Sequence, residues 1–174
     1  SEDHPHHTGI YFTYGSEGEV NGDDFWGQTT GDSAQIKHVK VTKMAGGTGK
    51  GKLSSVAHWV SSKGNVLLEE NREMVFRACE NEYVIDFSID LTAQDERVVF
   101  KDTKEGMLAI RVAPFLRETA GSEWVKGVTG TAEYLSSNGD KGEKNIWGKR
   151  ARWVRLQGEK DGKVIGVVIM NHPS

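Results

Sequence analysis

The sequence predicts an all-β protein, an antiparallel sandwich or barrel, from three observations. Apolar residues recur with a period of two in most segments, as expected for strands with one buried face. Glycine is abundant (21 residues) and proline is rare (3 residues), a balance typical of short strands joined by tight turns. No segment shows the 3.6-residue apolar stripe of an amphipathic helix. Strands therefore alternate with turns along the whole chain.

The clearest strand covers residues 82–91, where Ile85, Phe87 and Ile89 alternate with polar residues. Residues 164–170 are apolar on both faces, which predicts a central strand covered on both sides. Asn-Gly at 138–139 and Asp-Gly at 161–162 are dipeptides that favour type I′ hairpin turns, because both central residues need positive φ. The predicted strands, in order, are 10–14, 39–42, 53–60, 69–78, 82–91, 98–100, 107–113, 151–156 and 164–170.

Length and charge exclude several classes of protein. The chain has 174 residues, enough for one domain with a real core, and we expect a single β-sandwich domain over 1–174. Its 22 basic and 25 acidic residues give a net charge of −3. The chain therefore lacks the excess of positive charge that nucleic-acid binding requires. No apolar run is long enough to span a membrane. The compartment and the oligomeric state stay open.

The single cysteine and the chain ends carry further expectations. Cys79 excludes an internal disulfide and a cysteine-based zinc site, and its apolar neighbours predict a core position. The chain begins at Ser1 without an initiator methionine and stops just after an apolar run. We therefore expect a piece of a longer protein.

The densest group of chemically active side chains is Asp3-His4-Pro5-His6-His7. Pro5 favours an extended backbone at His4, so His4 and His6 would project to the same side. Neutral imidazoles suit a divalent metal such as zinc, copper or iron, and the same histidines, with His7, suit general-base catalysis near neutral pH. An expression-tag remnant or a solvated terminus is the alternative.

Two further motifs combine carboxylates with aromatic or basic residues. In residues 21–27, an Asn-Gly turn and two acids precede Phe-Trp, which is what a sugar site needs for hydroxyl binding and ring stacking. In residues 101–106, a Lys-Glu-Gly corner enters a strand and would place Glu105 and Arg111 on a sheet rim. A solvated hairpin turn with an Arg–carboxylate pair in the sheet explains the second motif better on the residues alone, and core packing explains most of the five tryptophans.

The chain resembles the PmoA family, bacterial proteins that bear the name methane oxygenase PmoA but have no settled function. The resemblance rests on five stretches in order: DHPHHTGIYF at 3–12, VNGDDFWG at 20–27, DTKEGMLAIRVA at 102–113, WGKRARWV at 147–154 and the final NHPS. It implies a large β-sandwich of the aldose-epimerase type, incomplete in this chain, and an association with sugar metabolism. The methane monooxygenase subunit of the same name is a helical membrane protein, whereas this sequence predicts an all-β fold. The resemblance therefore does not imply methane chemistry. Asp23 stands at the variable position of the family motif, so Asp24 is the acid carried over.

These observations predict a carbohydrate-active protein that performs acid/base chemistry on a sugar or keto-sugar. One alternative is a non-catalytic sugar-binding module, and another is a metal-dependent oxygenase, as the family name suggests. The sequence establishes no cofactor, and a divalent metal bound by His4 and His6 is the one it suggests. The expected catalytic residues are His4, His6, His7 and Glu105, and the expected substrate-binding residues are Asn21, Asp24, Trp26, Lys104, Arg111, Trp147 and His172.

Overall fold

A computed structural model describes residues 9–26, 33–118 and 130–172 of the chain. These residues form an all-β protein whose sheets are antiparallel, as predicted. The strands are β1 (Ile10–Tyr14), β2 (Gln35–Gly47), β3 (Lys50–Val60), β4 (Val66–Ala78), β5 (Tyr83–Ala93), β6 (Gly106–Ile110), β7 (Glu133–Ser136), β8 (Trp153–Lys160) and β9 (Lys163–Met170). Helical structure in these ranges is limited to the single turns η1 (Pro114–Leu116) and α1 (Glu143–Ile146). No helix among them has the length and apolar composition that a membrane crossing requires.

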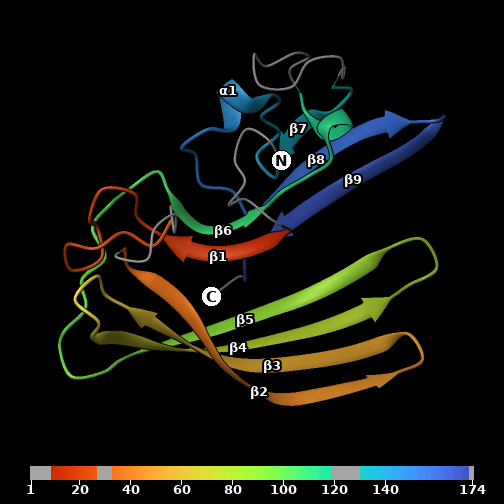
Figure 1. Cartoon of the computed structure of the whole chain (residues 1–174). Helices are drawn as coiled ribbons and strands as arrows, with labels where there is room; N and C mark the ends of the chain where they lie inside the picture. Colours follow the sequence, from red (N-terminus) through yellow and green to blue (C-terminus); the bar gives the residue numbers. More distant parts are fainter. Residues whose placement is uncertain (1–8, 27–32, 119–129, 173–174) are drawn as a thin grey trace. The chain divides into compact units, whose positions relative to one another are not determined.

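The chain forms two compact units, described here one at a time (Figure 1). Unit 1 combines Ser1–Tyr11 with Ala109–Ser174, and unit 2 is the continuous stretch Phe12–Leu108. The boundaries fall inside β1 and β6, which pair as a two-stranded sheet. The expected single domain over 1–174 and its aldose-epimerase type stay predictions.

Unit 2 is built on a four-stranded sheet in the order β2-β3-β4-β5, joined by successive hairpins (Figure 1). Residues directly opposite each other share a face, and one cross-strand row reads Met44, Leu53, Met74 and Phe87. The other face is polar: for example, Lys52 pairs with Glu73 at 2.7 Å. The apolar face is the one predicted from the alternation in residues 82–91.

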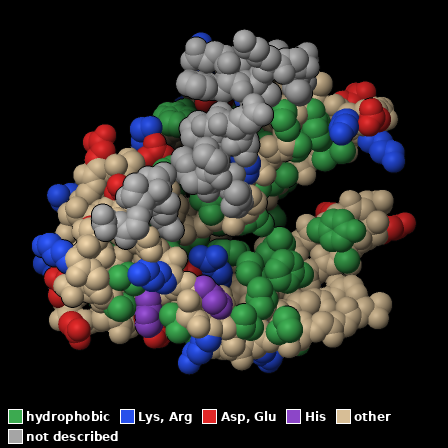
Figure 2. Space-filling model, viewed as in Figure 1, with side chains coloured by type: hydrophobic (Ala, Val, Ile, Leu, Met, Phe, Trp, Pro, Cys, Tyr) green, Lys and Arg blue, Asp and Glu red, His purple; other side chains and the backbone are tan. Residues whose placement is uncertain are grey.

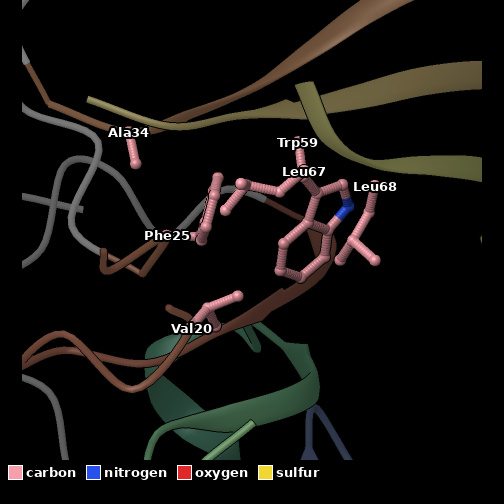
Figure 3. Close-up of a cluster of buried hydrophobic side chains, with 6 residues drawn as sticks. All are labelled: Val20, Phe25, Ala34, Trp59, Leu67 and Leu68. Carbon is pink, nitrogen blue, oxygen red and sulfur yellow. The ribbon is translucent and has the colours of Figure 1, made fainter. Parts of the chain in front are cut away.

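One half of this apolar face packs against residues of the segments 14–26 and 94–106, which together with the hairpin turn 61–65 we call the loop cluster. All three lie at the end of the sheet where β3 and β5 finish and β4 begins (Figure 1). Figure 3 shows Val20 and Phe25 from the loops approaching Trp59 of β3. The rings of Phe25 and Trp59 are 4.8 Å apart, and both side chains are fully buried. The core of unit 2 therefore joins the loop cluster to the sheet.

The other half of the apolar face is open. Met44 and Phe76 lie towards the far hairpins and are 83% and 37% exposed. Figure 2 shows hydrophobic side chains gathered on this part of the sheet. Cys79, expected in the core, is exposed instead, because it follows β4 in the turn at the open end.

Unit 1 contains a three-stranded sheet in the order β7-β8-β9 and a small core of Leu116, Ala132 and Leu156. The sequence predicts that residues 164–170 form a central strand covered on both faces. In the described sheet β9 is instead an edge strand, paired only with β8, and Val164 and Met170 are 67% and 68% exposed. An apolar sequence alone does not distinguish a covered strand from an uncovered one.

The two predicted type I′ turns differ in outcome. Asp161 and Gly162 have φ of 54° and 72° and join β8 to β9, as predicted. In the other turn φ is positive at Gly139 (85°) and not at Asn138. The N–H of Gly139 donates to the carbonyl of Ser136 at 3.0 Å, so the central residues of this turn are Ser137 and Asn138 and not Asn138 and Gly139.

Candidate functional site

The first predicted sugar-site motif begins with a two-residue hairpin. Asn21 and Gly22 have φ of 53° and 92°, the pattern of a type I′ turn. Val20 and Asp23 close the turn by exchanging backbone hydrogen bonds of 3.0 and 2.9 Å. Asn and Gly are the residues that best tolerate this backbone conformation. The sequence Val-Asn-Gly-Asp therefore folds locally and presents Asp23 and Asp24 just after a rigid turn.

The Asn21 side chain ties this hairpin to a distant segment. Its Nδ2 donates to the carbonyl of Arg97 at 2.9 Å, and its Oδ1 accepts from the backbone N–H of Val99 at 2.9 Å. Both ends of the carboxamide are thus used to hold residues 97–99 beside the hairpin. Substrate binding by Asn21 stays a prediction, and its visible role is to position the loops.

The second predicted motif lies in the same loop cluster. The N–H of Gly15 donates to the carbonyl of Glu105 at 2.9 Å, and the N–H of Trp26 donates to the carbonyl of Gly15 at 3.0 Å. Gly15 therefore connects Trp26 and Glu105, which are almost 80 positions apart in the sequence. The main chain of the expected acid/base residue and that of an expected stacking residue therefore lie on either side of Gly15 in unit 2.

Glu105 is partly buried, with 21% of its side chain exposed, and its carboxylate binds the Lys104 ammonium at 2.5 Å. This hydrogen bond and the negative charge of Glu105 raise the pKa of Lys104 above its ordinary value. Lys104 consequently stays protonated at neutral pH and acts as a hydrogen-bond donor. The pair offers one donor and one acceptor beside each other, which suits the hydroxyls of a sugar.

Glu19 stabilises the turn that carries Gly15. Its carboxylate accepts the backbone N–H groups of Ser16 and Glu17 at 2.8 and 2.7 Å. The hydrogen bond from the Glu17 N–H, with smaller contributions from the N–H groups of Glu19 and Ser16, holds the pKa of Glu19 below its ordinary value. The N–H of Lys101 also donates to the Glu19 carbonyl at 2.9 Å, so this residue joins the two motifs.

A cavity of about 340 Å³, open to solvent, lies within unit 2 and is lined in part by the hairpin motif. Its volume is in the range of small-molecule sites, but its lining is mostly polar. The lining residues are Asn21, Gly22, Asp23, Ser61, Ser62, Lys63, Asn65, Leu67 and Glu96. Asp23 fixes the wall of this cavity, since its Oδ1 accepts from the Ser62 hydroxyl at 2.6 Å and from the Ser62 N–H at 3.2 Å. Asp24, the acid carried over from the family motif, follows directly and is half-buried.

The remaining predicted residues that the structure describes belong to unit 1. Arg111 is half-buried after β6, and its backbone N–H donates to the carbonyl of Gly9 at 2.7 Å. Trp147 ends α1 and is 65% exposed, and His172 is exposed after β9. His4, His6 and His7 lie outside the described residues. Among the predicted residues of unit 2, the structure links Trp26 and Glu105 through the backbone of Gly15, and the roles of all the predicted residues stay predictions.

Sequence reasoning missed a buried charged group, Glu70 on β4. Its carboxylate accepts from Trp59 Nε1 at 2.8 Å and from Arg72 Nε at 2.7 Å, and the residue is fully buried. A signal was present, because Glu70 and Arg72 interrupt the period-two apolar pattern of Leu68, Met74 and Phe76. Charged residues in the apolar register of a strand indicate a buried ion pair.

The described residues contain no group of three or more His, Cys, Asp or Glu side chains that could hold a metal ion. Of the described histidines, His58 lies on β3, 3.7 Å from Glu69. The metal site expected at His4 and His6 falls outside the described ranges. The oxygenase alternative depends on that site and stays a prediction.

Comparison with known proteins gives one match, a family of unknown function, DUF6807, over residues 1–174. The chain belongs to this family. No curated protein matches the chain, and no solved structure does. Membership of DUF6807 assigns no activity, so the function must be argued from the site. The resemblance to the PmoA family stays a prediction.

Proposed function

We propose that this protein is carbohydrate-active and performs acid/base chemistry on a sugar or keto-sugar. The observation that carries the proposal is the convergence of two motifs, 20–26 and 101–106, in one loop cluster of unit 2. Hydrogen bonds from Gly15 to Glu105 and from Trp26 to Gly15 connect them. Hydroxyl-binding groups and an aromatic ring beside a carboxylate are the parts that sugar chemistry requires.

Each residue has a distinct role in this proposal. Glu105 acts as general acid or base, and Lys104 donates a hydrogen bond to a substrate hydroxyl or to Glu105 itself. Trp26 stacks on the sugar ring, and Asp24 accepts hydrogen bonds from hydroxyls. The sequence alone points to the histidines at 4, 6 and 7, outside the described residues, as candidates for a second acid/base group. A positioned acid or base contributes about 10²–10⁴ to the rate.

The test is Glu105→Gln, which keeps the shape of the side chain and removes proton transfer. The wild type is incubated with a panel of aldoses and ketoses, and products are followed by NMR. For any sugar that the wild type converts, we expect kcat to fall about 100-fold or more with little change in KM. Glu17→Gln is the matched control, because Glu17 lies in the Gly15–Glu19 turn and its side chain is exposed. Unchanged turnover by Glu105→Gln would contradict the role of Glu105.

The second candidate is a non-catalytic sugar-binding module. The polar lining of the cavity in unit 2 favours it, because such a lining can bind hydroxyls without any proton transfer. In that case sugar binding, measured by calorimetry, persists in Glu105→Gln and after substitution of His4, His6 and His7. Turnover of any sugar by the wild type excludes this candidate.

A further inference from the structure

The cavity of unit 2 is lined by polar groups that are not used within the described structure. The Lys63, Asn65 and Glu96 side chains are exposed at this cavity, and no hydrogen bond or ion pair within the described residues occupies the Lys63 ammonium, the Glu96 carboxylate or the Asn65 carboxamide. By contrast, the backbone of Asn65 is bound on both sides: its N–H donates to the Ser61 hydroxyl at 3.0 Å, and its carbonyl accepts from the Ser61 N–H at 2.8 Å. The backbone of this wall is therefore fixed while its side chains are available to a ligand.

The wall carrying Lys63 is also tied to the hairpin across the cavity. Asp23 binds the neighbouring residue Ser62 through both its hydroxyl and its N–H, and the N–H of Gly64 donates to the Ser61 carbonyl at 2.9 Å. These contacts hold the turn 61–65 in one arrangement. A site with fixed walls loses less conformational entropy on binding than a mobile one.

The available groups match the hydroxyls of a sugar. A hydroxyl donates one hydrogen bond and accepts others, so a pair of neighbouring hydroxyls can bind a donor and an acceptor together. Lys63 supplies donors only, Glu96 supplies acceptors only, and Asn65 supplies both. Hydrogen bonds to charged groups are about twice as strong as those between neutral groups.

The charges of the lining distinguish between classes of sugar. Asp23 and Glu96 are acidic and Lys63 is basic, so the lining carries one net negative charge. A carboxylate on the ligand would be repelled by this excess, at a cost of about fivefold in affinity even with full solvent screening at about 4 Å. An uncharged sugar is not repelled by the lining.

We propose that this cavity is a subsite for an uncharged sugar residue, bound by Lys63, Asn65 and Glu96. The inference rests on the proposed carbohydrate function and deepens it by naming the class of ligand. None of these three residues was expected from the sequence to be functional.

The test uses the whole chain, labelled with ¹⁵N, titrated with methyl β-D-glucoside, methyl β-D-galactoside and methyl β-D-glucuronide. We expect amide shifts at 21–23, 61–65 and 96 with at least one neutral glycoside, and at least fivefold weaker binding of the glucuronide. Lys63→Met and Glu96→Gln should each weaken the neutral glycoside at least fivefold. Lys50→Met and Glu80→Gln, which lie at the far hairpins of the sheet, should leave binding unchanged.

Several results would overturn the inference. Shifts confined to other residues, a glucuronide that binds as tightly as the neutral glycosides, or unchanged affinity in both cavity variants each do so. If Glu105→Gln abolishes turnover while the cavity variants bind normally, the subsite is wrong and the proposed function stands. If no glycoside shifts any amide and no sugar of the panel is bound or converted, both the subsite and the proposed function are wrong.

Discussion

Glu70 is a charged residue in a fully buried position. An ionised carboxylate without partners inside a protein is strongly destabilising. Glu70 is fully buried but fully paired, since Trp59 donates to one oxygen and Arg72 to the other. The Arg72 side chain is 23% exposed and also lies 5.4 Å from the centre of the Phe87 ring. The Arg72 side chain thus extends from the buried Glu70 carboxylate to the surface, where solvent reaches it.

Replacing Glu70 with alanine should therefore be costly. Glu70→Ala leaves the indole N–H of Trp59 buried without an acceptor and Arg72 without its counter-charge. Breaking a buried pair costs about 3–5 kcal/mol. We expect the free energy of unfolding to fall by about 3 kcal/mol, the lower end, because Arg72 reaches solvent. The measurement is urea unfolding. Glu69→Gln is the control: its exposed pair with His58 should contribute less than about 1 kcal/mol. Equal effects of the two changes would show that Glu70 is not structurally important.

Glu19 makes stability depend on pH in a defined direction. Its folded-state pKa lies below the unfolded value near 4.5, because the N–H groups of Glu17 and Ser16 bind the ionised form. A depressed pKa stabilises the fold above the unfolded pKa, and this contribution disappears as the pH falls through the folded pKa. We expect Glu19→Gln to be less stable than the wild type at pH 7 and the difference to shrink below pH 4.5. Urea unfolding at several pH values checks this, and a difference that grows on acidification contradicts it.

At the level of elements, strands were predicted best where one face is buried and the other is exposed to solvent. The alternation of Ile85, Phe87 and Ile89 correctly indicated β5, and the Asp-Gly dipeptide correctly indicated the turn before β9. The strand expected at 98–100 is only an isolated bridge between Val20 and Phe100. The strand β7 was missed, because four residues are too few to show a period.

The contact between β1 and β6 depends on one glycine. Gly106 has a φ of 157°, and a Cβ atom there would lie 2.4 Å from Cδ2 of Tyr14. The Tyr14 ring cannot move away freely, since it packs edge-on against Phe100 at 5.2 Å. We therefore expect Gly106→Ala to lower the free energy of unfolding by about 2–3 kcal/mol.

The matched control for this change is Gly46→Ala. Gly46 lies in β2 with open space around its Cα, so alanine there should be neutral or slightly stabilising. Thermal unfolding of the two variants gives the comparison. A Gly106→Ala protein as stable as the control would mean that Tyr14 adapts at no cost.

At the level of the whole molecule, the site was harder to predict than the fold. The sequence identified Trp26 and Glu105 separately, but no local pattern shows that Gly15 connects them through backbone hydrogen bonds. Nothing in the sequence gives a reason to propose Lys63 and Glu96 either, because a cavity forms from residues distant in sequence. Periodicity reports which face of one strand is buried and carries no information on which loops meet.

The two units have cores of different size, which predicts different local stability. Trp59, Phe25 and Val20 are fully buried in unit 2, whereas the core cluster of unit 1 consists of Leu116, Ala132 and Leu156. Segments with few buried contacts open at lower free energy than the core, and hydrogen exchange measures that opening. Amides in the half of β3 and β4 next to the loop cluster should exchange slowest.

β9 should exchange much faster, even though its sequence is the most apolar in the chain. It is an edge strand of the described sheet, with hydrogen-bond partners on β8 alone and with exposed residues along most of its length. Native-state hydrogen exchange read by NMR provides the comparison within one sample, so β3 and β4 serve as the internal reference. Equal protection of β9 and β3 would contradict the exposed edge and show that β9 is covered in solution. In that case its apolar sequence would have correctly predicted a covered strand.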